Sequence, residues 1–232
     1  MAMRPTVRGG RRNLVLAFAV GVVAAVAFIA VAQLLSKKKA PDVVANPVVN
    51  ISGIPQHDVI LGKPGAEVTL VEYADQQCPG CRYYTLNIFP TLVNEYVRPG
   101  KIDMRYHGFP FIGSDSLKAL RFLLAAANQN RLWQLQEALY RHQGAENSGW
   151  ITDDLIRQLA SQIAGLDVDR LFRDAGSAAI GAKADAQLKS ADAADIPGTP
   201  TFFIQVGKAK PYDIRVSDVT QFRQALDDAL DG

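Results

Sequence analysis

The longest apolar run of the chain lies near its amino-terminus, between two groups of basic residues. Residues 14–35 contain no charged side chain. As a helix, these 22 residues span about 33 Å, against about 30 Å for the hydrocarbon core of a bilayer. Arginines precede the run, and residues 37–39 are all lysine. The pattern predicts a single uncleaved transmembrane helix, with a secreted form cut after the AVA of residues 30–32 as the alternative.

Hydrophobic patterning divides the rest of the chain into three parts. Residues 1–13 form a basic tail, which we expect on the cytoplasmic side. Residues 36–58 hold three prolines among small and β-branched residues, which predicts an extended linker. The remaining residues, 59–232, are sufficient for one domain with a core of its own.

Within this domain the pattern alternates between strand-like and helical segments, which predicts an α/β fold. The run EVTLVEY at 67–73 is β-rich and nearly continuous in apolar residues, as expected for a central strand covered on both faces. Apolar spacings of three and four residues predict a long helical block from Ser116 to about Ser190. Further expected elements are a helix at 83–97, strands at 102–106, 201–206 and 212–216, and a last helix ending at Leu230.

Small and polar residues predict the ends of several of these helices. Thr152 and Asp167 are expected amino-terminal caps, since their side chains can accept a hydrogen bond from a free backbone amide. Gly165 is an expected carboxyl-terminal cap. Ser217 is expected to cap the last helix.

The only two cysteines of the chain are three residues apart, in the segment Cys78-Pro79-Gly80-Cys81. Residues i and i+3 in the first turn of a helix face the same side, so the two sulfurs can form a disulfide. The first sulfur lies at the positive end of the helix dipole, which favours the thiolate. A CxxC between a strand and a helix is typical of a thioredoxin-like redox site. Half of a zinc site is the other interpretation, but His57, His107 and His142 are scattered and no metal or other cofactor is expected.

A second motif, IPGTPTFFI at 196–204, places Thr199-Pro200 directly before a β-rich run. With the CxxC, this step resembles that of the DsbA family of thiol-disulfide oxidoreductases, in the thioredoxin-fold superfamily. The resemblance extends from about Val59 to the carboxyl-terminus. It implies a cis peptide bond at Pro200 beside the cysteines, and an inserted helical domain at about 114–192. Gly80 departs from the histidine of the best-known oxidase of the family, which puts the oxidising strength in question.

The resemblance also implies roles for individual residues. Cys78 is expected to be the exposed nucleophile and Cys81 the buried resolving thiol. Glu72, six residues before Cys78, matches a buried acid under the active site that could relay protons. The alternative is that strand alternation turns Glu72 toward solvent.

Charge and redox chemistry limit the function. Seven of the 25 basic residues flank the apolar run, so the chain from residue 40 onward has 18 basic and 23 acidic residues, a net charge of −5. This balance argues against a nucleic-acid partner. Disulfide formation belongs in an oxidising compartment, so we expect the domain outside the cytoplasmic membrane, with the apolar helix in lipid.

The leading hypothesis is an enzyme that donates disulfides to exported proteins with free cysteines. The resemblance implies reoxidation by a membrane partner of the DsbB or vitamin K epoxide reductase-like type. A thiol reductase or isomerase of the same compartment, and a thiolate metal-binding module, are the alternatives.

Overall fold

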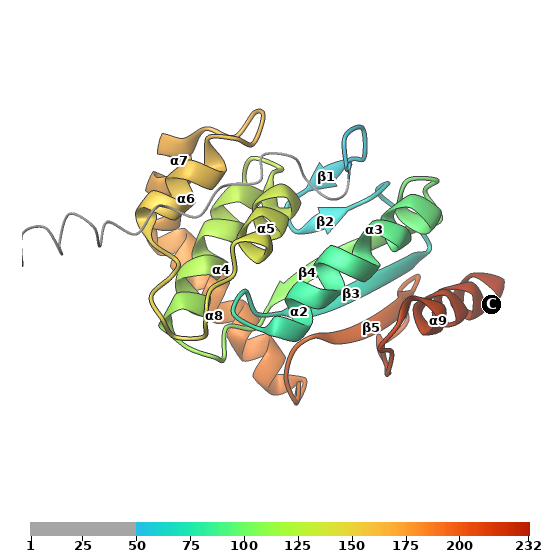
Figure 1. The fold of residues 1–232 in the computed structure, drawn as a ribbon. Helices are drawn as coiled ribbons and strands as arrows, with labels where there is room; N and C mark the ends of the chain where they lie inside the picture. The colour runs from blue at the N-terminus through green and yellow to red at the C-terminus, as the bar shows by residue number, and fades with distance from the viewer. Residues whose placement is uncertain (1–49) are drawn as a thin grey trace, which may run out of the picture. The chain divides into compact units, whose positions relative to one another are not determined.

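The computed structural model describes residues 50–232, so the predicted basic tail, transmembrane helix and most of the linker lie outside the described residues. Within 50–232, no helix is long and apolar enough to cross a membrane. Figure 1 shows a sheet with helices packed against it. The strands are β1 (Gln56–His57), β2 (Ile60–Leu61), β3 (Val68–Ala74), β4 (Ile102–Gly108), β5 (Thr201–Val206) and β6 (Tyr212–Ile214). The helical segments are α2 (Pro79–Tyr83), η1 (Tyr84–Ile88), α3 (Phe89–Leu92), η2 (Val93–Val97), α4 (Ser114–Ala127), α5 (Leu132–Arg141), α6 (Asp153–Ala160), α7 (Val168–Ala175), α8 (Ala178–Ala193) and α9 (Val219–Asp231).

Strand β3 lies inside the sheet, whose order is β1-β2-β4-β3-β5-β6. It pairs in parallel with β4 and antiparallel with β5. The parallel pairing requires a crossover, and the helical segment 79–97 supplies it. The register places Glu72 beside Tyr106 on β4 and Phe202 on β5.

Both faces of the sheet are covered, as the apolar pattern of β3 predicts. On one face Tyr84, Phe202 and Phe222 form an aromatic cluster with ring centroids 4.6 to 5.4 Å apart, which joins η1 and α9 to β5. On the other face Tyr73 packs against His107 and Phe203. Glu72 therefore faces the side of the sheet that carries α2 and η1.

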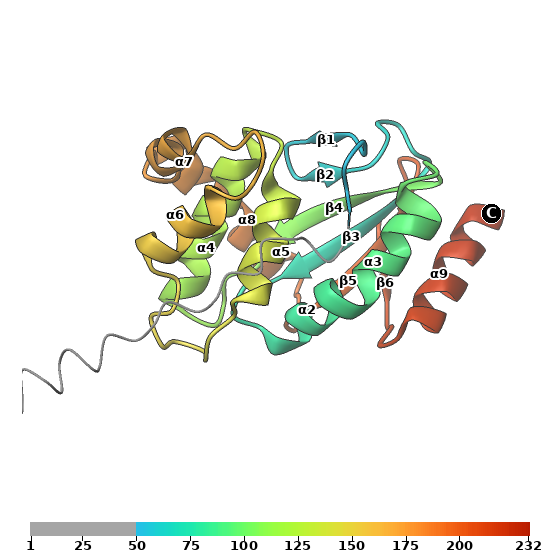
Figure 2. The ribbon, with the colours of Figure 1, turned by 45° about the horizontal axis from the view of Figure 1, so that its top comes forward.

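The chain between β4 and β5 forms the helical insertion, α4 to α8. Figure 2 shows these helices gathered beside the end of β3, next to α2. Stacking of Phe89 on Trp133, with centroids 5.6 Å apart, joins α3 to α5 of the insertion. The insertion thus lies against the helix that begins at the cysteine motif.

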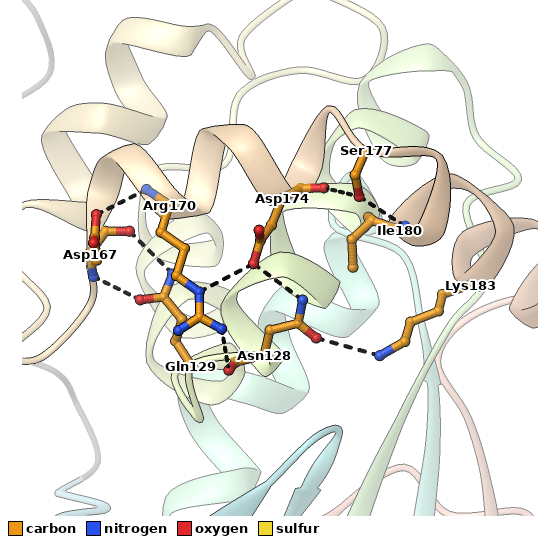
Figure 3. Close-up of polar contacts among 8 residues, drawn as sticks. All are labelled: Asn128, Gln129, Asp167, Arg170, Asp174, Ser177, Ile180 and Lys183. Carbon is orange, nitrogen blue, oxygen red and sulfur yellow. Dashed lines mark hydrogen bonds and ion pairs between the residues drawn. The ribbon is translucent and has the colours of Figure 1, made fainter.

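Polar side chains on the surface of the insertion connect the end of α4 to α7 and α8 (Figure 3). Gln129 donates to the Asp167 carbonyl oxygen at 3.1 Å and accepts from the Asp167 amide at 2.9 Å. Asp174 contacts Asn128 and Arg170. We call this group the exposed cluster; it comprises Asn128, Gln129, Asp167, Arg170, Asp174, Ser177 and Lys183.

Two expected helix ends are confirmed and two are wrong. Thr152 and Asp167 accept hydrogen bonds from backbone amides at the starts of α6 and α7. Gly165 does not cap α6, which ends at Ala160; at φ +78° it forms the turn that leads to α7. Asp218 rather than Ser217 caps α9, because one carboxylate oxygen can accept from two amides at once.

The folded domain begins earlier than the sequence predicts. The sequence assigns residues 50–58 to the linker, but Ile51 and Ile54 are buried and Gln56 enters strand β1. The Arg98 guanidinium also donates to the carbonyl oxygens of Asn50 and Ser52. Two apolar residues in a proline-containing segment carry little periodic signal, so sequence patterning missed this packing.

Candidate active site

The cysteine motif begins helix α2 directly after strand β3. Cys78 is the cap residue with an extended backbone (φ −72°, ψ 120°), and Pro79 occupies the first turn, as predicted. Both cysteines are free thiols. Cys81 is fully buried, and Cys78 is only 7% exposed. The expectation of an exposed Cys78 is therefore wrong, because the segment before β5 covers its sulfur.

That segment contains the second predicted motif. The peptide bond between Thr199 and Pro200 is cis, as the sequence predicts. The Cys78 thiol donates to the Thr199 carbonyl oxygen at 3.1 Å, which brings together residues 121 positions apart. A Cβ atom on Gly80 would lie 3.0 Å from Pro200 Cδ, so the absence of a side chain allows this close approach.

The two thiols have very different acidities. The pKa of Cys78 is lowered to about 6, chiefly by a hydrogen bond from the Cys81 thiol. The Thr199 side chain and the backbone amides of Cys81 and Gly80 also stabilise the thiolate, while burial opposes them. Burial raises the pKa of Cys81 well above its usual value. At neutral pH the pair therefore holds one thiolate and one thiol.

Glu72 lies under the motif on β3 and is only 1% exposed, so the solvent-facing alternative is wrong. Burial raises its pKa to about 8, and the negative charge of Cys78 adds to this effect. The Gln136 side chain, from α5, acts in the opposite direction and lowers the pKa. Glu72 in turn contributes to the raised pKa of Cys81, so the two groups are electrostatically linked.

Sequence reasoning missed a set of polar residues around the segment that leads to Cys78. We call residues 75–78 the active-site loop. Asp75, Gln76 and Gln77 are all buried, although polar residues between a strand and a motif suggest an exposed turn. The side chains that hold this loop come from the helical insertion, and we call them the loop clamp: Ser116, Tyr140, Gln143 and Asn147. The only sign of this arrangement in the sequence is the run of three polar residues, 75–77, directly after the strand.

Histidines do not join the cysteines. His107 contacts the Gln187 carbonyl oxygen at 2.9 Å, and His142 contacts the Ala138 carbonyl oxygen at 2.9 Å. Within residues 50–232, no group of three or more His, Cys, Asp or Glu side chains could hold a metal ion. His107 on β4 therefore contacts helix α8, and His142 contacts the last turn of α5.

Comparisons with known proteins agree with this geometry. The family model described as Thioredoxin matches residues 55–228. A probable disulfide bond formation protein D from Bacillus cereus is 27% identical over 173 residues, which cover 73% of this chain and 77% of that protein.

Solved structures show the same fold. BdbD from Bacillus subtilis in its oxidised form has a TM-score of 0.68 at 22% identity, and the match covers 81% of this chain and all of that one. Wolbachia pipientis alpha-DsbA1 has a TM-score of 0.66 at 22% identity, and covers 77% of this chain and 94% of that one. The predicted thioredoxin fold with a helical insertion is confirmed for the described residues. The chain therefore belongs to the thioredoxin family, and its resemblance to the DsbA-type thiol-disulfide oxidoreductases is confirmed.

Proposed function

We propose that this protein forms disulfide bonds in exported proteins, using Cys78 and Cys81 as its redox pair. The observation that carries the proposal is the pair of cysteines at the start of α2 beside the cis peptide bond of Pro200, where the surroundings lower the pKa of Cys78 to about 6. A stabilised thiolate favours the dithiol form over the disulfide, which has no thiolate. The disulfide form then gives up its oxidising equivalents readily to a substrate.

The reaction follows thiol-disulfide exchange. A substrate thiolate attacks the Cys78 sulfur of the oxidised pair; the Cys78–Cys81 bond breaks, and a mixed disulfide forms while Cys81 leaves with the electron pair. A second substrate thiolate then attacks the substrate sulfur of this mixed disulfide. Cys78 leaves as a thiolate, the substrate is oxidised by two electrons, and the protein is left as the dithiol.

Glu72 is proposed to supply the proton that Cys81 needs. With a pKa of about 8, its carboxyl group is mainly protonated at neutral pH. The Cys81 thiolate formed in the first step is buried, where a charge is costly. Proton transfer from the Glu72 carboxyl group to the Cys81 sulfur neutralises it, and the carboxylate regains a proton in the next cycle.

The cellular setting is also part of the proposal. The apolar run 14–35 anchors the protein in the cytoplasmic membrane with residues 1–13 inside, and 36–49 connect the anchor to the catalytic domain outside. Reoxidation of the dithiol requires an electron acceptor, for which we propose a quinone-linked membrane protein of the DsbB or vitamin K epoxide reductase-like type. The names of relatives refer to disulfide bond formation, which supports the redox role that this setting serves.

A reductase or isomerase of the same compartment is the second candidate. Gly80 favours it, because a glycine brings no positive side chain to the Cys78 thiolate. Both candidates use the same residues and differ in direction, so the reduction potential decides between them.

The test uses a reduced peptide with two cysteines and the oxidised protein. Wild-type protein should oxidise the peptide stoichiometrically, Cys78→Ala should be inactive, and Cys81→Ala should accumulate a mixed disulfide detectable by mass spectrometry. Full turnover by Cys81→Ala would contradict the assigned roles. A protein that reduces an oxidised peptide but fails to oxidise the reduced one supports the second candidate.

A further inference from the structure

The helical insertion holds the backbone of the active-site loop through its carbonyl oxygens. The Gln143 side-chain amide donates to the Gln76 carbonyl oxygen at 2.8 Å and to the Cys78 carbonyl oxygen at 3.1 Å. The Tyr140 hydroxyl donates to the Asp75 carbonyl oxygen at 3.1 Å. Three carbonyl groups of residues 75–78 are thus bound by two residues at the end of α5.

Side chains of the loop itself complete this arrangement. The Asp75 carboxylate accepts from the Gln77 amide at 2.8 Å and from the Ser116 hydroxyl at 2.6 Å. The Gln77 side chain accepts from the Asn147 amide at 2.6 Å and donates to Ser116 at 2.9 Å. The insertion therefore binds both the backbone and the side chains of the active-site loop.

The Cys78 carbonyl group has a direct geometric connection to the reactive sulfur. Cys78 is the cap residue of α2, and a Cβ atom on Gly80 would lie 3.6 Å from its sulfur, so the first turn of the helix lies beside the sulfur. The backbone amides of Gly80 and Cys81 contribute to its lowered pKa. The Cys78 carbonyl belongs to the planar peptide unit that joins it to Pro79, so the orientation of this unit sets where the following amides point. The Cys78 carbonyl oxygen already accepts from the Arg82 amide at 3.2 Å, and a second donor further restrains the backbone from which the sulfur projects.

We propose that Gln143 is a positioning residue for the nucleophile: by binding the Cys78 carbonyl oxygen, it keeps the Cys78 sulfur beside the first turn of α2. Gln143 touches neither sulfur and acts through the backbone. The inference rests on the proposed exchange reaction at Cys78. It makes the helical insertion part of the redox chemistry, in addition to covering the site.

The experiment compares two equivalent glutamines of the full chain. Gln143→Met removes the donor at the active-site loop. Gln129→Met is the control, because Gln129 is also half-buried in the insertion and also binds backbone groups, those of Asp167 in the exposed cluster (Figure 3). The readouts are thiolate absorbance of the reduced protein against pH, the rate of reaction with glutathione disulfide, and the denaturant midpoint.

Gln143→Met should raise the midpoint of the Cys78 titration by about one pH unit, which lowers the thiolate fraction at pH 6 about fivefold. The rate with glutathione disulfide at pH 6 should fall with it. Gln129→Met should lower the denaturant midpoint but leave the titration unchanged. If Gln143→Met does not fold, Gln143→Leu, which also lacks the donor and fills similar space, replaces it with the same expected shift.

An unchanged titration in a folded Gln143 variant overturns the proposal, because a purely structural role would lower stability alone. An equal shift in Gln129→Met also overturns it, because the effect would then report general loosening. Peptide oxidation by the wild-type protein is measured alongside. Its absence would contradict the proposed function, whereas a normal wild type with an unshifted Gln143 variant contradicts only this inference.

Discussion

The helical insertion carries two polar groups that do the same structural work, one around a buried loop and one at the surface. The loop clamp holds residues 75–78 and is formed around the buried side chains of Asp75 and Gln77. The exposed cluster holds the ends of α4, α7 and α8 at the surface (Figure 3). In both, a glutamine side chain binds backbone groups of a distant segment. An aspartate also accepts from the amide of a residue two or three positions later: Asp75 of the active-site loop in the first case, and Asp167 in the second.

Burial separates the two groups energetically. A polar atom without a partner inside the protein loses its full hydration energy, whereas one at the surface regains water. Replacing a residue near the active site should therefore have large effects, some of them favourable, while the same change in the exposed cluster should have small ones. The ionisable groups Glu72 and Cys78 lie where burial makes a charge costly, and the thiol chemistry depends on these same groups.

The largest expected effect is that of Asp75→Ala. The Asp75 carboxylate accepts from Ser116 and from the amides of Gln77 and Ile112, and the substitution leaves all three donors without this acceptor. We expect a loss of about 3 to 4 kcal/mol in the free energy of unfolding, measured by urea denaturation. Asp75→Asn retains one acceptor oxygen and should lose less. If Asp75→Ala loses no more unfolding free energy than Asp167→Ala, the active-site loop and the exposed cluster do not differ in the way we propose.

Glu72→Gln should have an effect of similar size and opposite sign. The folded-state pKa of about 8 lies above the unfolded value of 4.5, so wild-type stability falls as pH rises from 4.5 through 8. At pH 7 the penalty is about 3 kcal/mol, which the neutral glutamine avoids. Urea denaturation at pH 5 and pH 7 should show the gain growing with pH. The idea fails if the variant and the wild type have the same pH dependence.

Asp167→Ala tests the exposed cluster. Asp167 caps α7 by accepting from the Arg170 amide at 2.9 Å, while its own backbone contacts to Gln129 do not depend on the side chain. Loss of an amino-terminal cap costs about 1 kcal/mol. Thermal or urea unfolding measures it, with Asp167→Asn as a control that keeps the acceptor. A loss near that of Asp75→Ala would show that burial is not the deciding factor.

The smallest effect should come from Arg170→Ala. Its guanidinium lies 3.5 Å from the Asp174 carboxylate, four residues along α7, and about half of the Arg170 side chain is exposed. Such surface pairs contribute about 0.3 to 0.5 kcal/mol, and salt screens them. The difference from wild type should shrink further in 1 M salt. A difference above 1 kcal/mol that persists in high salt would contradict this assignment.

Sequence patterning predicted what depends on local periodicity and on short motifs. Strand β5 begins and ends as predicted. The cis bond at Pro200 was implied by the family resemblance that the Thr-Pro step and the cysteine motif carry together, and the structure has it. The burial of Glu72 could be stated only as one of two alternatives, because alternation along a strand does not say which face is covered by which helix.

The loop clamp was not predictable in this way. Gln143 and Asn147 lie 65 or more residues after the loop they bind, in a segment without apolar periodicity. Their role depends on the packing of α5 against α3, which only the three-dimensional structure supplies. The low exposure of Cys78 has the same origin, since its cover comes from the segment before β5.

The central claim, that the fold stabilises the Cys78 thiolate and so favours the dithiol form, is tested most directly by denaturing both redox forms at pH 5 and pH 7. The folded-state pKa of about 6 lies below the usual value of 9.0, so this stabilisation is complete above pH 9 and is lost as pH falls through 6. The free energy of unfolding of the dithiol form, relative to the disulfide form, should rise by about 1.4 kcal/mol from pH 5 to pH 7, equivalent to about 30 mV. A difference between the two forms that does not change with pH would contradict the account.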